Sequence, residues 1–178
     1  MWHDAAVSEN KRAPWWATLV ATSCGAGFMP VAPGHTGTAT AVALAWALSR
    51  VGAWCFGLGL FVVVAVGTLA AEVWGQATGV PDDQRIVVDE VAGYLVTVML
   101  VPRTWANLLV GFVVFRTLDV WKPGPIRRVD EHVGGGVGVM ADDLVAGVIG
   151  AFVMLALHLS GAIARLATVA HVPGLLAR

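Results

Sequence analysis

Charged side chains are scarce in this chain of 178 residues. They make up 13% of the residues, whereas ordinary soluble domains carry roughly 25%, and 57% of the residues are hydrophobic. This composition predicts an integral membrane protein rather than a soluble domain. The formal net charge of -1 provides no basic field, so we expect no nucleic-acid partner.

Cysteine is also scarce, and several catalytic signatures are missing. Cys24 and Cys55 both lie in apolar surroundings, which predicts small buried side chains rather than a disulfide framework or a zinc site. No Walker sequence is present, so nucleotide binding is not expected. Apart from a faint match at residues 33–35, the sequence blocks of the acid-phosphatase-like lipid phosphatases are absent. The Asp-Gly-x2-Ala-Arg signature of CDP-alcohol phosphotransferases is absent as well. No cleavage site follows a short apolar core, so a cleavable signal peptide is not expected.

Long apolar segments are the main feature that is present. They predict a single all-α, membrane-embedded domain over residues 15–165, preceded by a polar leader over residues 1–14 and followed by a surface tail over residues 166–178. We expect an integral membrane helical bundle of about four to five spanning helices. An interfacial helix is expected to begin at Trp15, because paired tryptophans are typical of a membrane interface.

The helical segments are separated by prolines, glycines and polar loops. The expected helices cover residues 38–51, 54–73, 86–101, 104–118 and 144–160. Prolines and glycines over residues 30–37 interrupt the helical pattern, and Pro102 predicts a hairpin turn. Residues 74–85 and 121–139 are predicted to be polar loops. The second loop ends in the glycine-rich stretch 134–138, which is either a loose linker or a loop that approaches a phosphate closely.

Five carboxylates stand at the edges of the apolar segments. Acids near a bilayer are costly and usually face a polar cavity or a partner. A hairpin at Pro102 returns the first acidic pair to the neighbourhood of Asp119, so we predict that all five acids meet on one face. They are Asp89, Glu90, Asp119, Asp142 and Asp143.

Gathered carboxylates repel one another unless a cation neutralises them, and hard oxygen ligands make Mg2+ the first candidate. Basic residues lie close to the acids in the sequence and suit a phosphate: Arg116, Lys122, Arg127 and Arg128. Carboxylates, Mg2+ and guanidinium groups together indicate phosphoryl transfer or phosphate-ester hydrolysis.

Each of these features also has a purely structural interpretation. Asp142 and Asp143 can also be explained as acids in the first turn of the last helix, where the helix dipole favours them. Asp119 and Lys122 are three residues apart and can form a surface ion pair. Arg127 and Arg128 can serve only as a topology signal.

The positions of the basic residues predict the orientation in the membrane. The acid-bearing face is expected to hold seven bases: Lys11, Arg12, Arg85, Arg116, Lys122, Arg127 and Arg128. The opposite face holds Arg50, Arg103 and Arg165. By the positive-inside rule, the acid-bearing face is therefore expected to be cytoplasmic.

Four blocks of the sequence resemble the phosphatidylglycerophosphatase A family. They are Gly-Phe-Met-Pro-Val-Ala-Pro-Gly over residues 27–34, Ile-Val-Val-Asp-Glu-Val-Ala-Gly over 86–93, Asp-x-Trp-Lys-Pro-x-Pro-Ile-Arg over 119–127, and the Met-Ala-Asp-Asp-Leu block within 135–147. They cover roughly residues 20–160. The resemblance implies a Mg2+-dependent phosphatase of the bacterial inner membrane, which converts phosphatidylglycerophosphate to phosphatidylglycerol and phosphate.

The resemblance also implies roles for individual residues. The five acids match metal-binding or catalytic positions, and Arg116 and Lys122 match phosphate-contacting positions. His35 stands where the family usually has threonine, so we include His35, Thr36 and Arg127 among the candidate substrate-binding residues. The nucleophile is either a water molecule or an aspartate, with Asp89 or Asp119 as the candidates.

Two alternatives to this function remain at the sequence level. One is a non-enzymatic membrane protein, either a divalent-cation carrier or an assembly factor. The other is a diverged phosphatase that acts on a different lipid phosphate. The acids lie at helix edges rather than near the bilayer midplane, which favours a surface enzyme site over a carrier. The sequence is also compatible with a homo-oligomer.

Overall fold

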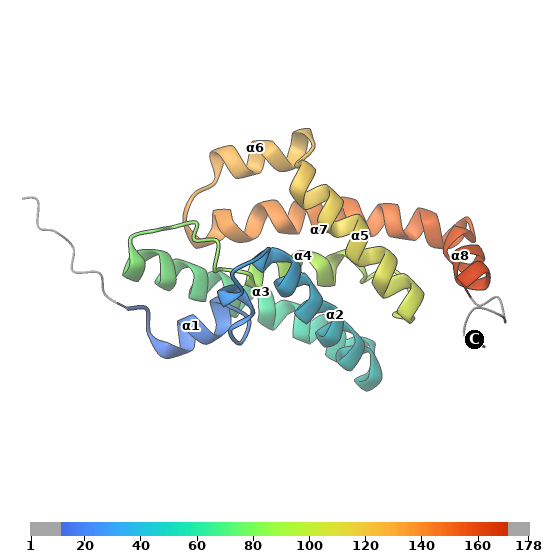
Figure 1. Ribbon diagram of the computed structural model, residues 1–178, viewed down its shortest axis with the longest axis horizontal. Helices are drawn as coiled ribbons and strands as arrows, with labels where there is room; N and C mark the ends of the chain where they lie inside the picture. The colour runs from blue at the N-terminus through green and yellow to red at the C-terminus, as the bar shows by residue number, and fades with distance from the viewer. Residues whose placement is uncertain (1–11, 171–178) are drawn as a thin grey trace, which may run out of the picture.

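The computed structural model describes residues 12–170, and every element in this part of the chain is a helix. The elements are α1 (Trp15–Ala21), η1 (Ala26–Phe28), α2 (Pro33–Val51), α3 (Ala53–Thr78), α4 (Val88–Thr97), α5 (Trp105–Trp121), α6 (Gly124–His132), α7 (Gly135–Leu159) and α8 (Ala162–Ala170). Figure 1 shows α7 along the length of the molecule, with α6 beside its beginning and α8 at its end. The all-α prediction is confirmed. Most of the predicted leader and tail, residues 1–11 and 171–178, lies outside the described residues.

Two of the described helices, α3 and α7, are long and apolar enough to cross a membrane. Only 17% of the most apolar window of α3 is buried in the protein, so most of its apolar surface faces outward. Large apolar side chains on α5, such as Leu109 and Val113, are exposed as well. Such a surface is stable against lipid and costly in water, so the chain is a membrane protein. The larger number of four to five spans stays a prediction.

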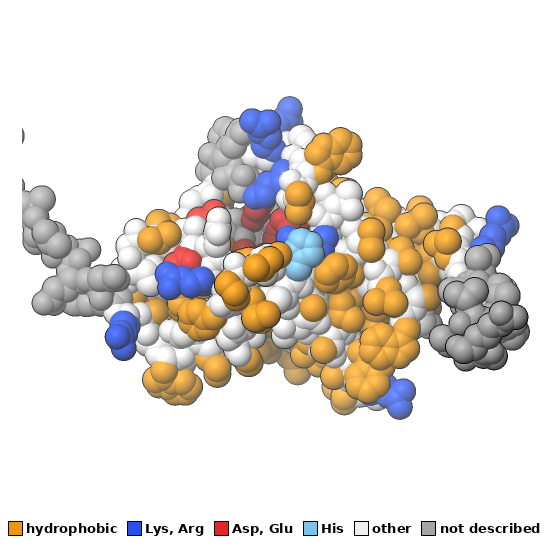
Figure 2. Space-filling model, viewed as in Figure 1, with side chains coloured by type: hydrophobic (Ala, Val, Ile, Leu, Met, Phe, Trp, Pro, Cys, Tyr) orange, Lys and Arg blue, Asp and Glu red, His pale blue; other side chains and the backbone are white. Residues whose placement is uncertain are grey.

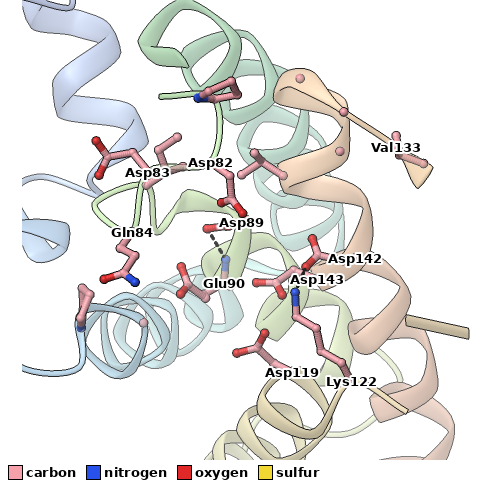
Figure 3. A pocket seen from close by; sticks show the side chains of 18 of the residues that line it. Asp82, Asp83, Gln84, Asp89, Glu90, Asp119, Lys122, Val133, Asp142 and Asp143 are labelled. Carbon is pink, nitrogen blue, oxygen red and sulfur yellow. Dashed lines mark hydrogen bonds and ion pairs between the residues drawn. The ribbon is translucent and has the colours of Figure 1, made fainter. Parts of the chain in front are cut away.

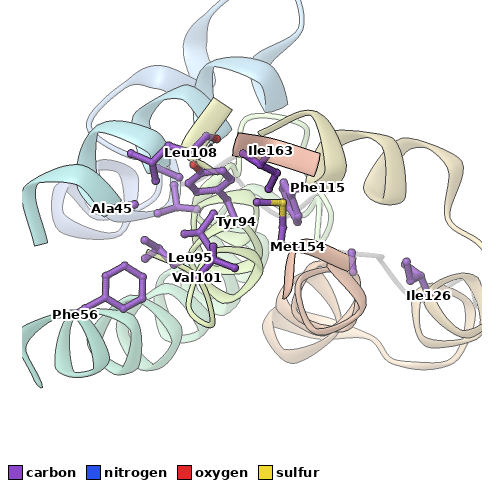
Figure 4. Close-up of a cluster of buried hydrophobic side chains, with 14 residues drawn as sticks. Ala45, Phe56, Tyr94, Leu95, Val101, Leu108, Phe115, Ile126, Met154 and Ile163 are labelled. Carbon is purple, nitrogen blue, oxygen red and sulfur yellow. Dashed lines mark hydrogen bonds between the residues drawn. The ribbon is translucent and has the colours of Figure 1, made fainter. Parts of the chain in front are cut away.

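Helix α4 is the buried centre of the bundle. It contacts α2, α3, α5 and α7, and its residues from Val91 to Thr97 are all buried. The Tyr94 hydroxyl donates a hydrogen bond to the carbonyl of Leu108 at 2.8 Å, which ties α4 to α5. Figure 4 shows Tyr94 among the apolar side chains that surround it, including Phe115 and Met154. The central position of α4 fixes the place of the acids at its first turn.

The predicted helix over residues 86–101 is too long. The amide of Val87 donates to the carbonyl of Ala21 at 2.8 Å, which holds this residue outside the helix, and α4 ends at Thr97. Ten residues extend about 15 Å, half of a bilayer core of roughly 30 Å. Helix α4 is therefore enclosed by the other helices rather than being a span of its own.

Glycines bring α4 and α7 into direct backbone contact. A Cβ atom added to Gly93 would lie 2.5 Å from the carbonyl oxygen of Asp143, and one added to Gly147 would collide with the carbonyl oxygen of Gly93. One turn further on, Gly150 packs against the side chain of Thr97. The contacts advance in the same direction along both helices, so α4 and α7 run parallel. This register places the first turn of α4 beside Asp143.

Further helix boundaries differ from the prediction. Helix α2 begins at Pro33 and α6 begins at Gly124 followed by Pro125, because proline is tolerated in the first turn, where its missing N–H is not needed. Helix α6 therefore occupies part of the predicted loop over 121–139, and Ile126 anchors it because this side chain is fully buried. Helix α3 continues to Thr78, where a left-handed glycine ends it.

The glycine-rich stretch 134–138 is not a loose linker, because residues 135–138 form the first turn of α7 against α3. Its close approach to a phosphate stays a prediction. The N–H of Gly136 donates to Oε2 of Glu72 at 2.6 Å, and a Cβ atom there would lie 2.6 Å from the Glu72 nitrogen. Glu72 thus caps α7 from a neighbouring helix. Asp142 lies about two turns inside α7, so the interpretation of the second acidic pair as first-turn acids is wrong.

Replacement of Glu72 by alanine is expected to loosen the start of α7. The Gly136 N–H then loses its acceptor, and we expect its amide hydrogen to exchange several-fold faster in detergent-solubilised protein, measured by hydrogen–deuterium exchange. Glu72→Gln keeps a carbonyl acceptor and should restore protection. Gln76→Ala is the matched control, since it removes only the bond from Gln76 Nε2 to Glu72 Oε1. Equal exchange in the alanine variant and the wild type would contradict this capping role.

Candidate active site

A cavity of about 510 Å³ lies where the beginnings of α2, α4 and α7 meet the end of α5, with the loop over residues 79–87 along one side. Figure 2 shows acidic and basic side chains gathered in this hollow, with hydrophobic side chains around it. Seven carboxylates line it: Asp82, Asp83, Asp89, Glu90, Asp119, Asp142 and Asp143. Two bases, Arg116 and Lys122, and His35 line it as well. The five acids predicted from the sequence do meet at one place.

Three of the acids form a compact cluster on α4 and α7. Asp89, Glu90 and Asp143 each place one carboxylate oxygen within 4.8 Å of the others (Figure 3). Asp143 is 3% exposed, so its charge has little access to water. Within the described residues, Glu90 Oε2 and Asp143 Oδ2 are buried and accept no hydrogen bond. Buried carboxylate oxygens without partners are costly, and a hard divalent cation between them would supply the missing interaction.

The protein environment disfavours the charged forms of the two acids on α4, which is outside the candidate spans. Burial raises the pKa of Asp89 well above its ordinary value, and the adjacent Glu90 carboxylate raises it further. Burial likewise raises the pKa of Glu90 to about 7, with smaller contributions in the same direction from Asp143 and Asp119. These carboxyl groups therefore need a proton or a cation for neutralisation.

Arg116 on α5 bridges two of the acids. Its Nη1 atom lies 2.5 Å from Oδ2 of Asp119 and 3.8 Å from Oε1 of Glu90. Gly34, at the start of α2, leaves room for this arrangement. A Cβ atom at Gly34 would collide with Oε1 of Glu90 and lie 2.9 Å from Nη1 of Arg116. The pair of Arg116 and Asp119 is thereby fixed beside the acidic cluster.

Lys122 connects α5 to α7. It follows the last residue of α5 in a left-handed conformation with φ of 43°, and its Nζ donates to Oδ2 of Asp142 at 2.7 Å. Lys122 thus reaches α7, while Arg116 is the ion-pair partner of Asp119. The lysine ammonium group lies at the cavity wall, where it is available to an anion as well as to Asp142.

The other predicted substrate-binding residues lie in different places. His35 lines the cavity, is exposed, and packs edge-on against Phe112 with ring centroids 6.2 Å apart. The Thr36 hydroxyl instead donates to the carbonyl of Ala26 at 2.8 Å or that of Pro33 at 2.6 Å, and Thr36 is not a lining residue. Arg127 lies on α6, exposed and outside the cavity lining. The catalytic and binding roles of all these residues stay predictions.

Sequence reasoning missed Asp82, Asp83 and Gly34 as cavity residues. The Asp83 carboxylate accepts hydrogen bonds from the Arg85 side chain, one of them at 2.9 Å from Nε, and from Trp74 Nε1 at 3.4 Å. The bonds from Arg85 lower the pKa of Asp83 to about 2, so this acid stabilises its own loop. Asp82 is exposed on the side of the cavity where the 79–87 loop passes (Figure 3). The signal in the sequence was an acidic pair shortly before Asp89.

The acids outnumber the bases in this cavity, and that imbalance limits its chemistry. A phosphate ester carries negative charge and would be repelled by the seven carboxylates, which outnumber Arg116 and Lys122 among the described lining residues. A divalent cation at the acidic cluster would offset this negative charge and, together with Arg116 and Lys122, would provide cationic partners for a phosphate. Hydrolysis of a phosphate ester is the reaction that such a site suits best.

Comparisons with known proteins agree with this chemistry. Residues 19–158 match the family model described as phosphatidylglycerophosphatase A. The chain is 38% identical over 153 residues to phosphatidylglycerophosphatase A of Escherichia coli, covering 85% of this chain and 88% of the relative. It is 31% identical over 142 residues to the Haemophilus influenzae protein of the same name, covering 79% and 87%. It is 34% identical over 158 residues to a putative phosphatidylinositol-3-phosphatase of Bacteroides thetaiotaomicron, covering 82% and 95%. No solved structure matches.

Proposed function

The chain belongs to the phosphatidylglycerophosphatase A family and is a lipid phosphatase, and we propose that it hydrolyses the terminal phosphate of phosphatidylglycerophosphate with Mg2+ as cofactor. The products are phosphatidylglycerol and phosphate, in phospholipid biosynthesis. The observation that carries the proposal is the cluster of Asp89, Glu90 and Asp143, two of which keep buried oxygens without a hydrogen-bond partner among the described residues. The non-enzymatic alternatives are set aside, since the relatives are phosphatases by name.

The residues divide into those that hold the cation and those that hold the phosphate. Asp89, Glu90 and Asp143 would hold Mg2+, because their oxygens converge and suit a hard cation. Bound Mg2+ supplies charge neutralisation for the phosphate and lowers the pKa of a coordinated water molecule. Arg116 on α5 and Lys122 just after it would contact the phosphate oxygens, held in place by Asp119 and Asp142.

We favour water as the nucleophile. Asp119 is already engaged with Arg116, and Asp89 belongs to the carboxylate cluster, so neither is free to attack phosphorus. The water oxygen forms a bond to phosphorus as the bond from phosphorus to the glycerol oxygen breaks. The proton released by the water reaches a carboxylate of the site, and the departing glycerol oxygen takes up a proton.

The orientation follows from the distribution of basic residues. Exposed Arg127 and Arg128 lie on α6, and Lys122 and Val133, on either side of that helix in the chain, line the cavity. Arg50 lies near the end of α2, away from the cavity residues at the start of that helix. We therefore place the active site on the cytoplasmic side of the bacterial inner membrane. The lipid tails then remain in the bilayer while the headgroup enters the cavity.

The first test is phosphate release by detergent-purified protein from phosphatidylglycerophosphate, with Mg2+ and with EDTA. We expect release with Mg2+ and its loss with EDTA, restored when Mg2+ is added back in excess. Release that EDTA leaves unchanged would contradict the cofactor. Phosphatidylinositol 3-phosphate is the comparison substrate, because one relative is named for that activity. Faster hydrolysis of the inositol lipid would contradict phosphatidylglycerophosphate as the preferred substrate. It would leave the lipid phosphatase function unchanged.

A further inference from the structure

A run of exposed apolar residues leads directly into the wall of the catalytic cavity. Phe28, Met29 and Val31 expose 52%, 52% and 78% of their surface, and Pro30 is exposed as well. The four residues that follow, 32–35, all line the cavity. Consecutive exposed apolar residues are unfavourable in water and usually serve a function. We refer to residues 28–31 as the apolar rim.

The apolar rim is fixed at both ends. Before it, Gly27 lies against the backbone of Arg85, where a Cβ atom would collide with the carbonyl oxygen. After it, the Thr36 hydroxyl can donate to the carbonyl of Ala26 at 2.8 Å and so close the segment. Ala32 adopts a left-handed conformation with φ of 50°, which is unfavourable for a residue with a Cβ atom. Strain and apolar exposure in one segment beside a cavity suggest that the segment has a ligand to contact.

The surroundings of the rim define the chemistry of that ligand. On one side is the cavity with Arg116 and Lys122, which suit a phosphate. On the other side, His35 packs on Phe112 of α5, and one position further along that helix Val113 is 63% exposed. Figure 2 shows hydrophobic side chains immediately beside the charged side chains of the cavity. A molecule that fits this junction has an anionic end and an apolar end.

We infer that the apolar rim binds the acyl chains of the substrate next to its glycerol backbone and so guides the headgroup from the bilayer into the cavity. The inference rests on the proposed lipid phosphatase function, because it takes the occupant of the rim to be the lipid whose phosphate the cavity holds. The rim adds affinity for the lipid portion and leaves the chemical step unchanged. It therefore discriminates long-chain lipid phosphates from short, water-soluble phosphate esters.

The test compares two valines of similar exposure. Val31 on the rim is 78% exposed, and Val51 at the end of α2 is 69% exposed. In mixed micelles of dioleoyl phosphatidylglycerophosphate, Val31→Ser is expected to raise KM about tenfold with kcat unchanged, whereas Val51→Ser leaves both unchanged. The KM for a dibutyryl analogue of the same headgroup is expected to be the same in all three proteins. Equal KM values for the two variants on the long-chain lipid, or an equal rise on the dibutyryl analogue, would overturn the inference.

A second measurement separates the rim from the enzyme activity. In a chain with Cys24 and Cys55 replaced by alanine, a nitroxide label is attached at Val31→Cys or at Gln84→Cys, an exposed position on the polar side of the cavity. In liposomes, oxygen dissolved in the acyl chains should relax the label at position 31 more than a water-soluble nickel complex does, and the reverse should hold at position 84. Equal access of the nickel complex to both labels would overturn the inference about the apolar rim, even if the protein is an active phosphatase. Absence of activity on any lipid phosphate, with the label at 31 in the acyl chains, would overturn the proposed function alone.

Discussion

Asp89→Asn is expected to lower kcat for lipid phosphate hydrolysis on the order of a thousandfold. The side chain keeps its size, but the cluster with Glu90 and Asp143 loses one anionic oxygen and gains an amide that repels a cation. Asparagine also removes one of the buried like charges, so the folded protein should be at least as stable as the wild type. The measurement is steady-state phosphate release together with thermal unfolding in the same detergent.

The control for this prediction is Glu72→Gln, which makes the same change from carboxylate to amide on α3, outside the lining of the catalytic cavity. It should retain wild-type activity. Binding of Mn2+, followed by the loss of its free electron paramagnetic resonance signal, should weaken in Asp89→Asn and stay unchanged in Glu72→Gln. If the Asp89→Asn protein bound Mn2+ and hydrolysed the lipid phosphate like the wild type, Asp89 would not be part of the active site.

The sequence predicted the membrane class, the helical fold and the meeting of five carboxylates, because each depends on composition or on the order of apolar segments. It did not predict which acids form the compact cluster. The spacing of Asp119 and Lys122 suggested a local pair, yet α5 ends between them and Lys122 turns toward Asp142 on α7. That choice depends on the path of the chain after a helix end, which neighbouring residues alone do not determine.

The prolines and glycines were the least predictable part of the chain. Proline was taken as a break before α2 and in the loop after α5, but at both places it stands in the first turn of a helix. The glycines over 134–138 were taken as a loose linker or as a loop that approaches a phosphate, although Gly135 and Gly136 pack closely against Glu72 of α3. The sequence alone does not distinguish a glycine that permits close helix packing from a glycine that makes the backbone flexible. The distinction requires knowledge of the neighbouring helix.

Gly147→Ala is expected to destabilise the protein by about 1–3 kcal/mol and to reduce activity strongly, because the added Cβ atom would collide with the carbonyl oxygen of Gly93. It would also lie 3.0 Å from the Cβ of Val96, so backbone and side chain both resist it. Helix α7 must then move away from α4, and Asp143, one turn before Gly147, separates from Asp89.

The matched control is Gly57→Ala on α3, where an added Cβ atom has no neighbour within 4 Å. That variant should unfold at the wild-type temperature or slightly above it, because alanine favours a helix over glycine. The two variants carry the same substitution in long apolar helices, so a difference between them in unfolding temperature and in Mn2+ binding measures the α4–α7 contact itself. If Gly147→Ala matched Gly57→Ala in stability, metal binding and turnover, the close contact between these two helices would not be what brings the acids of the active site together.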